Sequence, residues 1–202
     1  MLFRSIGYQV GYSLAATGTI GFTGLGYQAG YSFNRSDSYC STFIGMYAGK
    51  NTTGSDNTFV GGISGYLNTT GSYNIGLGGG SFQANTSGSN NTAIGYLALQ
   101  ANTTANNNTA VGYQAGYTNS TGAYSTYFGA YAGLYPTNSN NTGIGYGALS
   151  GSAGATGANN TAVGSNALQA NTTASNNKAV GYQALYSATT NGSKDRKSTR
   201  LN

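Results

Sequence analysis

Short apolar stretches alternate along nearly the whole chain with polar stretches rich in Asn, Ser, Thr and Gly. The apolar stretches contain mostly Val, Ile, Thr and Tyr, and none has the 3.6-residue stripe of an amphipathic helix. Strand-forming residues that are interrupted every few positions by turn-forming residues are typical of short strands joined by turns. The pattern therefore predicts an all-β protein with almost no helix.

The apolar stretches keep a fixed phase with a glycine that returns every 15 to 19 residues, so the chain is a repeat array. The eleven repeat-phase glycines are Gly7, Gly26, Gly45, Gly61, Gly76, Gly95, Gly112, Gly129, Gly145, Gly164 and Gly181. An apolar residue precedes each one: Ile6, Leu25, Ile44, Val60, Ile75, Ile94, Val111, Phe128, Ile144, Val163 and Val180. We expect these eleven apolar residues, called the aliphatic rank below, to form one continuous buried core ladder.

Other positions repeat in the same phase. Alanine stands three residues after the glycine in eight copies, Gly or Leu follows it, and Thr stands three residues before the glycine in eight copies. The consensus is N-N-T-A-V-G-Y-Q-A-L followed by a polar stretch such as Q-A-N-T-T-A. A single copy buries too little surface to fold alone, whereas stacked copies cover one another. We therefore predict a parallel β-solenoid, or β-roll, of about eleven coils of 15 to 19 residues, forming one domain over residues 1–193.

Tyrosine follows the repeat-phase glycine in six copies, at Tyr8, Tyr27, Tyr96, Tyr113, Tyr146 and Tyr182. Strict strand alternation would point these rings inward, where a thin coil has little room. Two alternatives remain: the glycine is a corner that resets the alternation, or the tyrosines fill an interface between chains. A long exposed aromatic stripe usually marks an interface, so we expect self-association along the axis.

The N-[ST]-x-A-[VI]-G core resembles the head repeats of trimeric autotransporter adhesins, and the longer N-T-A-V-G-Y-Q-A-L form resembles repeats of bacterial and phage tail-fibre-domain proteins. The resemblance covers residues 1 to about 193, although adhesin heads use a shorter repeat. It implies a parallel β-roll assembled as a homotrimer on a cell surface or virion. It brings no catalytic residues with it.

Charged residues make up 5% of the chain and His is absent. Acid–base or nucleophilic catalysis needs a local cluster of ionisable groups, so we expect no enzyme activity, no cofactor and no metal site. The glycine-rich run 76–80 lacks the G-K-[ST] ending of a phosphate loop. Cys40 occupies a turn phase that holds Asn in other copies, which favours a tolerated turn substitution over a reactive thiol.

The end of the chain departs from the repeat. Residues 194–202 fall outside the array, and Asp195 to Asn202 (D-R-K-S-T-R-L-N) resembles the translation of a sequencing-library adapter. We expect this tail to be unstructured. The other basic residues, Arg4, Arg35, Lys50, Lys178 and Lys194, are scattered, which argues against nucleic-acid binding. No stretch approaches the ~20 apolar residues of a membrane helix, so no membrane insertion is expected within this segment.

These features indicate a structural segment of an extracellular fibre or adhesin, at the cell surface or on a virion, that acts as a spacer or as an adhesive head for a host-surface or glycan receptor. The alternative is a ligand-binding solenoid that uses its Thr, Asn and Tyr ladders to bind ice or a glycan. A regular threonine rank suits ice binding, although ice-binding solenoids usually carry two outward threonines per coil.

The same ladders leave N-glycosylation open. The N-x-[ST] sites are Asn34, Asn51, Asn68, Asn85, Asn90, Asn102, Asn107, Asn119, Asn140, Asn159, Asn171 and Asn191. Four of them, Asn68, Asn102, Asn119 and Asn171, stand seven residues after a repeat-phase glycine and would align glycans along one edge. The simpler interpretation is that Asn and Thr are turn residues here.

Overall fold

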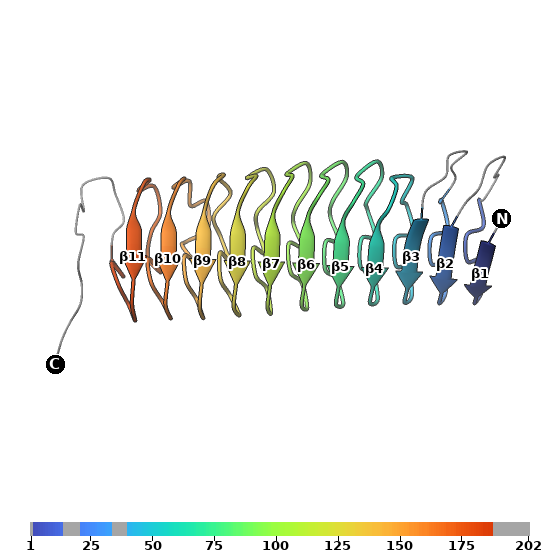
Figure 1. The fold of residues 1–202 in the computed structure, drawn as a ribbon, viewed down its shortest axis with the longest axis horizontal. Coiled ribbons are helices and arrows are strands. Elements are labelled where there is room, and N and C mark those ends of the chain that lie inside the picture. The colour runs from blue at the N-terminus through green and yellow to red at the C-terminus, as the bar shows by residue number, and fades with distance from the viewer. Residues whose placement is uncertain (1, 14–20, 34–39, 188–202) are drawn as a thin grey trace.

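The computed structural model of the protein describes residues 2–13, 21–33 and 40–187, and it contains eleven strands and no helix within those ranges. The strands are β1 (Leu2–Ile6), β2 (Gly21–Leu25), β3 (Cys40–Ile44), β4 (Thr58–Val60), β5 (Ile75–Leu77), β6 (Thr92–Ile94), β7 (Thr109–Val111), β8 (Thr126–Phe128), β9 (Thr142–Ile144), β10 (Thr161–Val163) and β11 (Lys178–Val180). Each strand pairs in parallel with the next, in the order β1 to β11, and the coils stack into an elongated rod (Figure 1). The prediction of an all-β parallel solenoid is confirmed.

The strand register places equivalent residues of the repeat side by side. Thr109 pairs with Thr126 and Val111 pairs with Phe128, and the same alignment continues along the sheet. The backbone N–H of Gly112 then donates to the carbonyl of Ile94 in the preceding coil at 2.7 Å. At ~4.8 Å per strand the eleven coils span on the order of 50 Å.

Ten of the eleven predicted repeat-phase glycines occupy this position, with a backbone φ between 125° and 135°. The exception is Gly76, whose assignment was wrong. Gly78 takes the position in that coil, with φ 132° and an N–H that donates to the carbonyl of Val60. Gly76 lies in the middle of β5 instead, and Ile75 pairs with Thr58 and Thr92. The sequence alone did not identify the repeat-phase glycine in this coil, because several glycines between residues 76 and 80 fit the repeat pattern.

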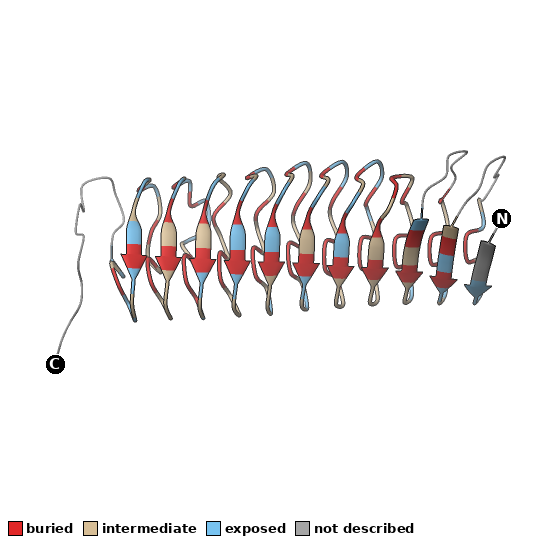
Figure 2. Ribbon diagram, viewed as in Figure 1, coloured by how far each residue is buried: buried red, intermediate tan, exposed pale blue. Residues whose placement is uncertain are grey.

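The predicted core ladder is contradicted by the structure. None of the eleven residues of the aliphatic rank is buried, and the exposed fraction reaches 73% at Ile6 and 69% at Val180. The affected residues are Ile6, Leu25, Ile44, Val60, Ile75, Ile94, Val111, Phe128, Ile144, Val163 and Val180. In β4 to β11 the buried residue is the middle one of the three, as the red band in each strand of Figure 2 shows.

Buried asparagines explain why the alternation runs this way. Asn74 lies directly before β5 and is fully buried. Its side-chain oxygen accepts from the N–H of Asn91 at 3.0 Å, and its side-chain nitrogen donates to the carbonyl of Gly88 at 2.8 Å. Residues two apart in a strand share a face. An Asn that points inward directly before the strand therefore places the middle strand residue, two positions later, on the inward face. The residues of the aliphatic rank then lie on the outward face.

The narrow interior is filled by a large and a small residue that alternate between two positions. Phe59 on the strand is matched by Gly65 across the coil, and a Cβ atom on Gly65 would lie 2.4 Å from the Phe59 ring. In the coil of β6 the sizes are reversed, with Ala93 on the strand and Leu99 opposite.

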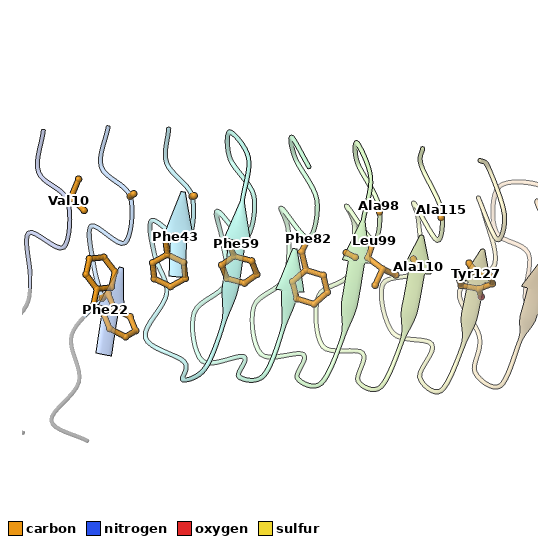
Figure 3. Packing of buried hydrophobic residues seen from close by; sticks show 14 of the residues in the cluster. Val10, Phe22, Phe43, Phe59, Phe82, Ala98, Leu99, Ala110, Ala115 and Tyr127 are labelled. Atoms are coloured by element: carbon orange, nitrogen blue, oxygen red, sulfur yellow. The ribbon is translucent and has the colours of Figure 1, made fainter. Parts of the chain in front are cut away.

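The coil of β7 differs, because Ala110 and Gly116 are both small. There a Cβ atom on Gly116 would lie 2.9 Å from Leu99 and 3.0 Å from Tyr127, so the neighbouring coils fill the space. Figure 3 shows Phe59, Leu99 and Tyr127, the last in the coil of β8, following one another along the axis.

Candidate functional site

The outward side of the sheet presents two parallel ladders, which we call the sheet face. One ladder is the aliphatic rank, in which Leu77 takes the place of Ile75 in β5. The other ladder is the threonine rank, three residues before each glycine. The threonine rank comprises Thr23, Thr42, Thr58, Thr92, Thr109, Thr126, Thr142 and Thr161, with Ile75 and Lys178 at the equivalent positions of β5 and β11. Among the side chains described on this face, Lys178 is the sole charged one. The sheet face is therefore a long, neutral surface of methyl and hydroxyl groups.

The tyrosines lie on the other side of the repeat-phase glycine, and they also point outward. Tyr8, Tyr27, Tyr96, Tyr113, Tyr146 and Tyr182 are between 43% and 73% exposed. Of the two alternatives, the structure shows that the glycine is a corner that resets the alternation. Its φ near 130° is a backbone conformation that side-chain-bearing residues rarely adopt, and this turns the next residue to the surface.

Four tyrosines from consecutive coils form a continuous series, which we call the tyrosine row: Tyr96, Tyr113, Tyr131 and Tyr146. The rings of Tyr96 and Tyr113 are stacked, with centroids 5.8 Å apart. Tyr131 meets Tyr113 edge-on at 5.2 Å and meets Tyr146 edge-on at 5.8 Å. Burial, followed by the nearby Tyr113 and Tyr146 side chains, raises the pKa of Tyr131. Tyr131 was not predicted from the sequence. It stands two residues after its glycine, a position at which most copies have another residue type.

A second aromatic group surrounds Lys50. Its ammonium group lies 4.8 Å from the ring centre of Tyr47 and 5.7 to 5.8 Å from those of Tyr66 and Tyr31. These distances lie within the range of cation–π attraction. The three rings come from three successive coils, so Lys50 ties the coils together at this point of the surface.

The structure separates the described N-x-[ST] sites into a buried and an exposed group, with Asn51 half-buried between them. Asn68, Asn102, Asn119 and Asn171 are buried, and each side-chain nitrogen donates to the backbone carbonyl three residues on. These four positions therefore do not suit the alternative of an edge of glycans, because the acceptor nitrogen is enclosed and engaged, and the simpler interpretation of Asn as a turn residue is favoured. Asn85 is buried in the same way. The exposed sites are Asn90, Asn107, Asn140 and Asn159, while Asn34 and Asn191 lie outside the described residues.

Ionisable side chains are few and dispersed. Cys40 is exposed and opens β3, where its backbone N–H donates to the carboxylate of Asp56 at 3.1 Å, so its placement in a turn was wrong. Across the described ranges, no three His, Cys, Asp or Glu residues lie close enough together to hold a metal ion. The predicted tail 194–202 lies outside the described residues.

Comparisons with protein-family models, with characterised proteins and with solved structures find no match for this chain. Within residues 2–13, 21–33 and 40–187, no helix is long and apolar enough to cross a membrane. The sheet face and the tyrosines are the extended surface features of the described residues.

Proposed function

We propose that this chain is a structural segment of an extracellular fibre or adhesin, at a cell surface or on a virion, in which it serves as a stiff spacer or adhesive head without catalysis. The observation that carries the proposal is a rod on the order of 50 Å long whose sheet face exposes apolar side chains along its full length. Exposed apolar surface of this extent usually marks an interface.

A second copy of the chain is the partner that this surface suits best. The side chains of each ladder are spaced by one strand, and this spacing is the same in every chain. The side chains of one rod therefore fit between the side chains of another. The sheet face offers almost no charge with which to bind a charged partner. A stable interface buries about 800 Å² on each partner, and a continuous apolar ladder along the whole rod favours contact over an extended area. The resemblance to adhesin heads favours three copies, with the tyrosines at the rim.

The proposal is tested by the mass of the assembly. Multi-angle light scattering on the full chain should give three chain masses, and a variant carrying Ile94→Asp and Ile144→Asp should dissociate because both side chains point outward from the sheet face. Ser87→Asp is the matched control, since Ser87 is exposed in the turn before β6. A parent protein that stays monomeric at high concentration would contradict self-association.

The alternative function is binding of an extended ligand, ice or a glycan, at the same surfaces. The observation that favours it is that the threonine rank faces outward on a regular sheet, with a second outward ladder beside it. Inhibition of ice recrystallisation by the monomer, lost in a Thr109→Asp variant, would support ice. Retention of the chain on immobilised polysaccharide would support a glycan.

A further inference from the structure

Tyr113 and Tyr131 are the pair of the tyrosine row whose rings lie nearest to each other, and, like Tyr131 and Tyr146, they are crossed rather than stacked. Tyr113 and Tyr131 come from adjacent coils, and their ring planes cross at 76° with the centroids 5.2 Å apart. Tyr96 and Tyr113 are instead stacked at 18°. In a stacked pair the ring edges point in the same direction. In the crossed pair the edge of one ring is directed at the other.

The two side chains of this pair also affect each other electrostatically. Burial raises the pKa of Tyr131, and so does the Tyr113 side chain, through its charge and through a hydrogen bond between the two side chains. In a phenol the ring carbons next to the hydroxyl carry much of the unpaired electron density once one electron and one proton have been removed. Because the ring centroids of Tyr113 and Tyr131 lie 5.2 Å apart, these reactive ring carbons have only a short distance to cross before they can bond.

We propose that Tyr113 and Tyr131 form an oxidative cross-linking site, at which a haem peroxidase with hydrogen peroxide joins the two rings into a dityrosine. Each phenol gives up one electron and its hydroxyl proton, and the peroxide is reduced to two molecules of water. The two phenoxyl rings then form one carbon–carbon bond. Each bonded carbon loses its hydrogen as a proton while the hydroxyl oxygens are reprotonated, so the pair loses two hydrogen atoms in total.

The surroundings favour this reaction at this place. Tyr113 is 44% exposed, so an oxidant reaches it. Tyr96 lies next to Tyr113 and Tyr146 lies next to Tyr131, in each case with ring centroids 5.8 Å apart. At this distance, a radical formed on either flanking tyrosine can be transferred to the pair. The sequence has no Trp and no His to compete. The new bond would join the coil of β7 to the coil of β8 and fasten two turns of the rod covalently.

The test uses the full chain treated with horseradish peroxidase and hydrogen peroxide. We expect dityrosine fluorescence, and digestion should yield a linked peptide pair containing residues 113 and 131 that lacks two hydrogen atoms. Tyr131→Phe should abolish this peptide pair, since phenylalanine does not form a phenoxyl radical. Tyr182→Phe is the matched control: Tyr182 is exposed in a distant coil and should leave the yield unchanged.

A mixture of ¹⁵N-labelled and unlabelled protein separates a link within one chain from a link between chains. A link within one chain gives peptide pairs that are wholly light or wholly heavy. Mixed light–heavy pairs for residues 113 and 131, or an unchanged fluorescence yield in the Tyr131→Phe variant, would overturn the proposal. Absence of the 113–131 peptide pair while other tyrosine pairs are linked would overturn it as well.

Discussion

At the scale of single residues, the repeat-phase glycine is the position that tolerates least. A Cβ atom on Gly112 would lie 2.6 Å from the carbonyl carbon and oxygen of Gly129 in the next coil, and φ is 134°. Neither backbone can move without breaking the parallel ladder. The glycine therefore recurs because the next coil occupies the space of a side chain.

We predict that Gly112→Ala lowers the free energy of unfolding by at least about 2 kcal/mol through backbone strain and the clash with Gly129. Gly62→Ala is the control, because nothing lies within 4 Å of a Cβ atom there. That variant should stay within about 0.5 kcal/mol of the parent. Denaturant unfolding monitored by circular dichroism measures both. Equal midpoints for the two variants would contradict the steric explanation.

Tyr127 places a hydroxyl group in the core. The side chain is fully buried and its hydroxyl makes no hydrogen bond of good geometry. Burial raises the pKa of Tyr127 to about 12, and the nearby Ser125 and Asn141 side chains lower it only in part. The fold therefore holds this phenol in its neutral form, and ionisation opposes folding.

We predict a loss of stability in alkali that depends on Tyr127. Its pKa is raised above the ordinary value of 10.0. The stability it contributes is therefore complete below pH 10 and is lost as the pH rises towards 12, by up to about 3 kcal/mol. Tyr127→Phe should remove this part of the slope. At neutral pH it should leave stability equal or about 1 kcal/mol higher, because an unpaired hydroxyl is lost. Thermal melts from pH 8 to 12 test this, and parallel slopes would contradict it.

At the scale of one coil, two positions, one on the strand and one opposite it, share the interior volume. The large side chain can stand at either position. The coil of β4 fills this volume with Phe59 and leaves Gly65 opposite, whereas the coil of β6 has Ala93 and Leu99. Leu99 adopts φ 48° and Gly65 adopts φ 60°, so the backbone at the two positions is nearly the same. The two arrangements should therefore be interchangeable.

We predict that Phe59→Ala costs about 3 kcal/mol by leaving a cavity, and that Gly65→Leu is destabilising because its side chain meets the Phe59 ring. The double variant should recover most of both losses, since each change makes room for the other. Chemical denaturation of the two single variants and the double variant gives the coupling energy. Additive losses would show that the two positions do not share one volume.

At the scale of the whole molecule, folding depends on backbone ladders, buried amides and small apolar contacts, with little contribution from charge. His is absent from the sequence, and Asp56 is the sole carboxylate side chain among the described residues. We predict that the melting temperature changes little between about pH 5 and pH 9, because few groups titrate in that range. Melts in three buffers at constant ionic strength check this. A strong dependence would reveal ionisable contacts outside the described residues.

Much of the architecture was predictable from the repeat. The parallel stacking of one coil on the next and ten of the eleven glycine positions were correct, because these depend on periodicity alone. The interior was predicted wrongly. We predicted that Val111, the larger apolar residue of T-A-V, would be buried. In the structure Ala110 is fully buried and Val111 is partly exposed. Hydrophobicity does not identify the buried face when both faces carry apolar side chains.

The sequence by itself determined that the chain is a stack of short parallel strands with a glycine at every corner, because a period repeated eleven times leaves few other ways to bury backbone polar groups. Which face turns inward was decided by the tertiary structure. The asparagine ladder, exemplified by Asn74 and Asn91, is satisfied mainly by carbonyls and amides of neighbouring coils. Those partners exist only after stacking, and the buried amides then direct the alanines inward and leave the aliphatic rank and the tyrosines at the surface.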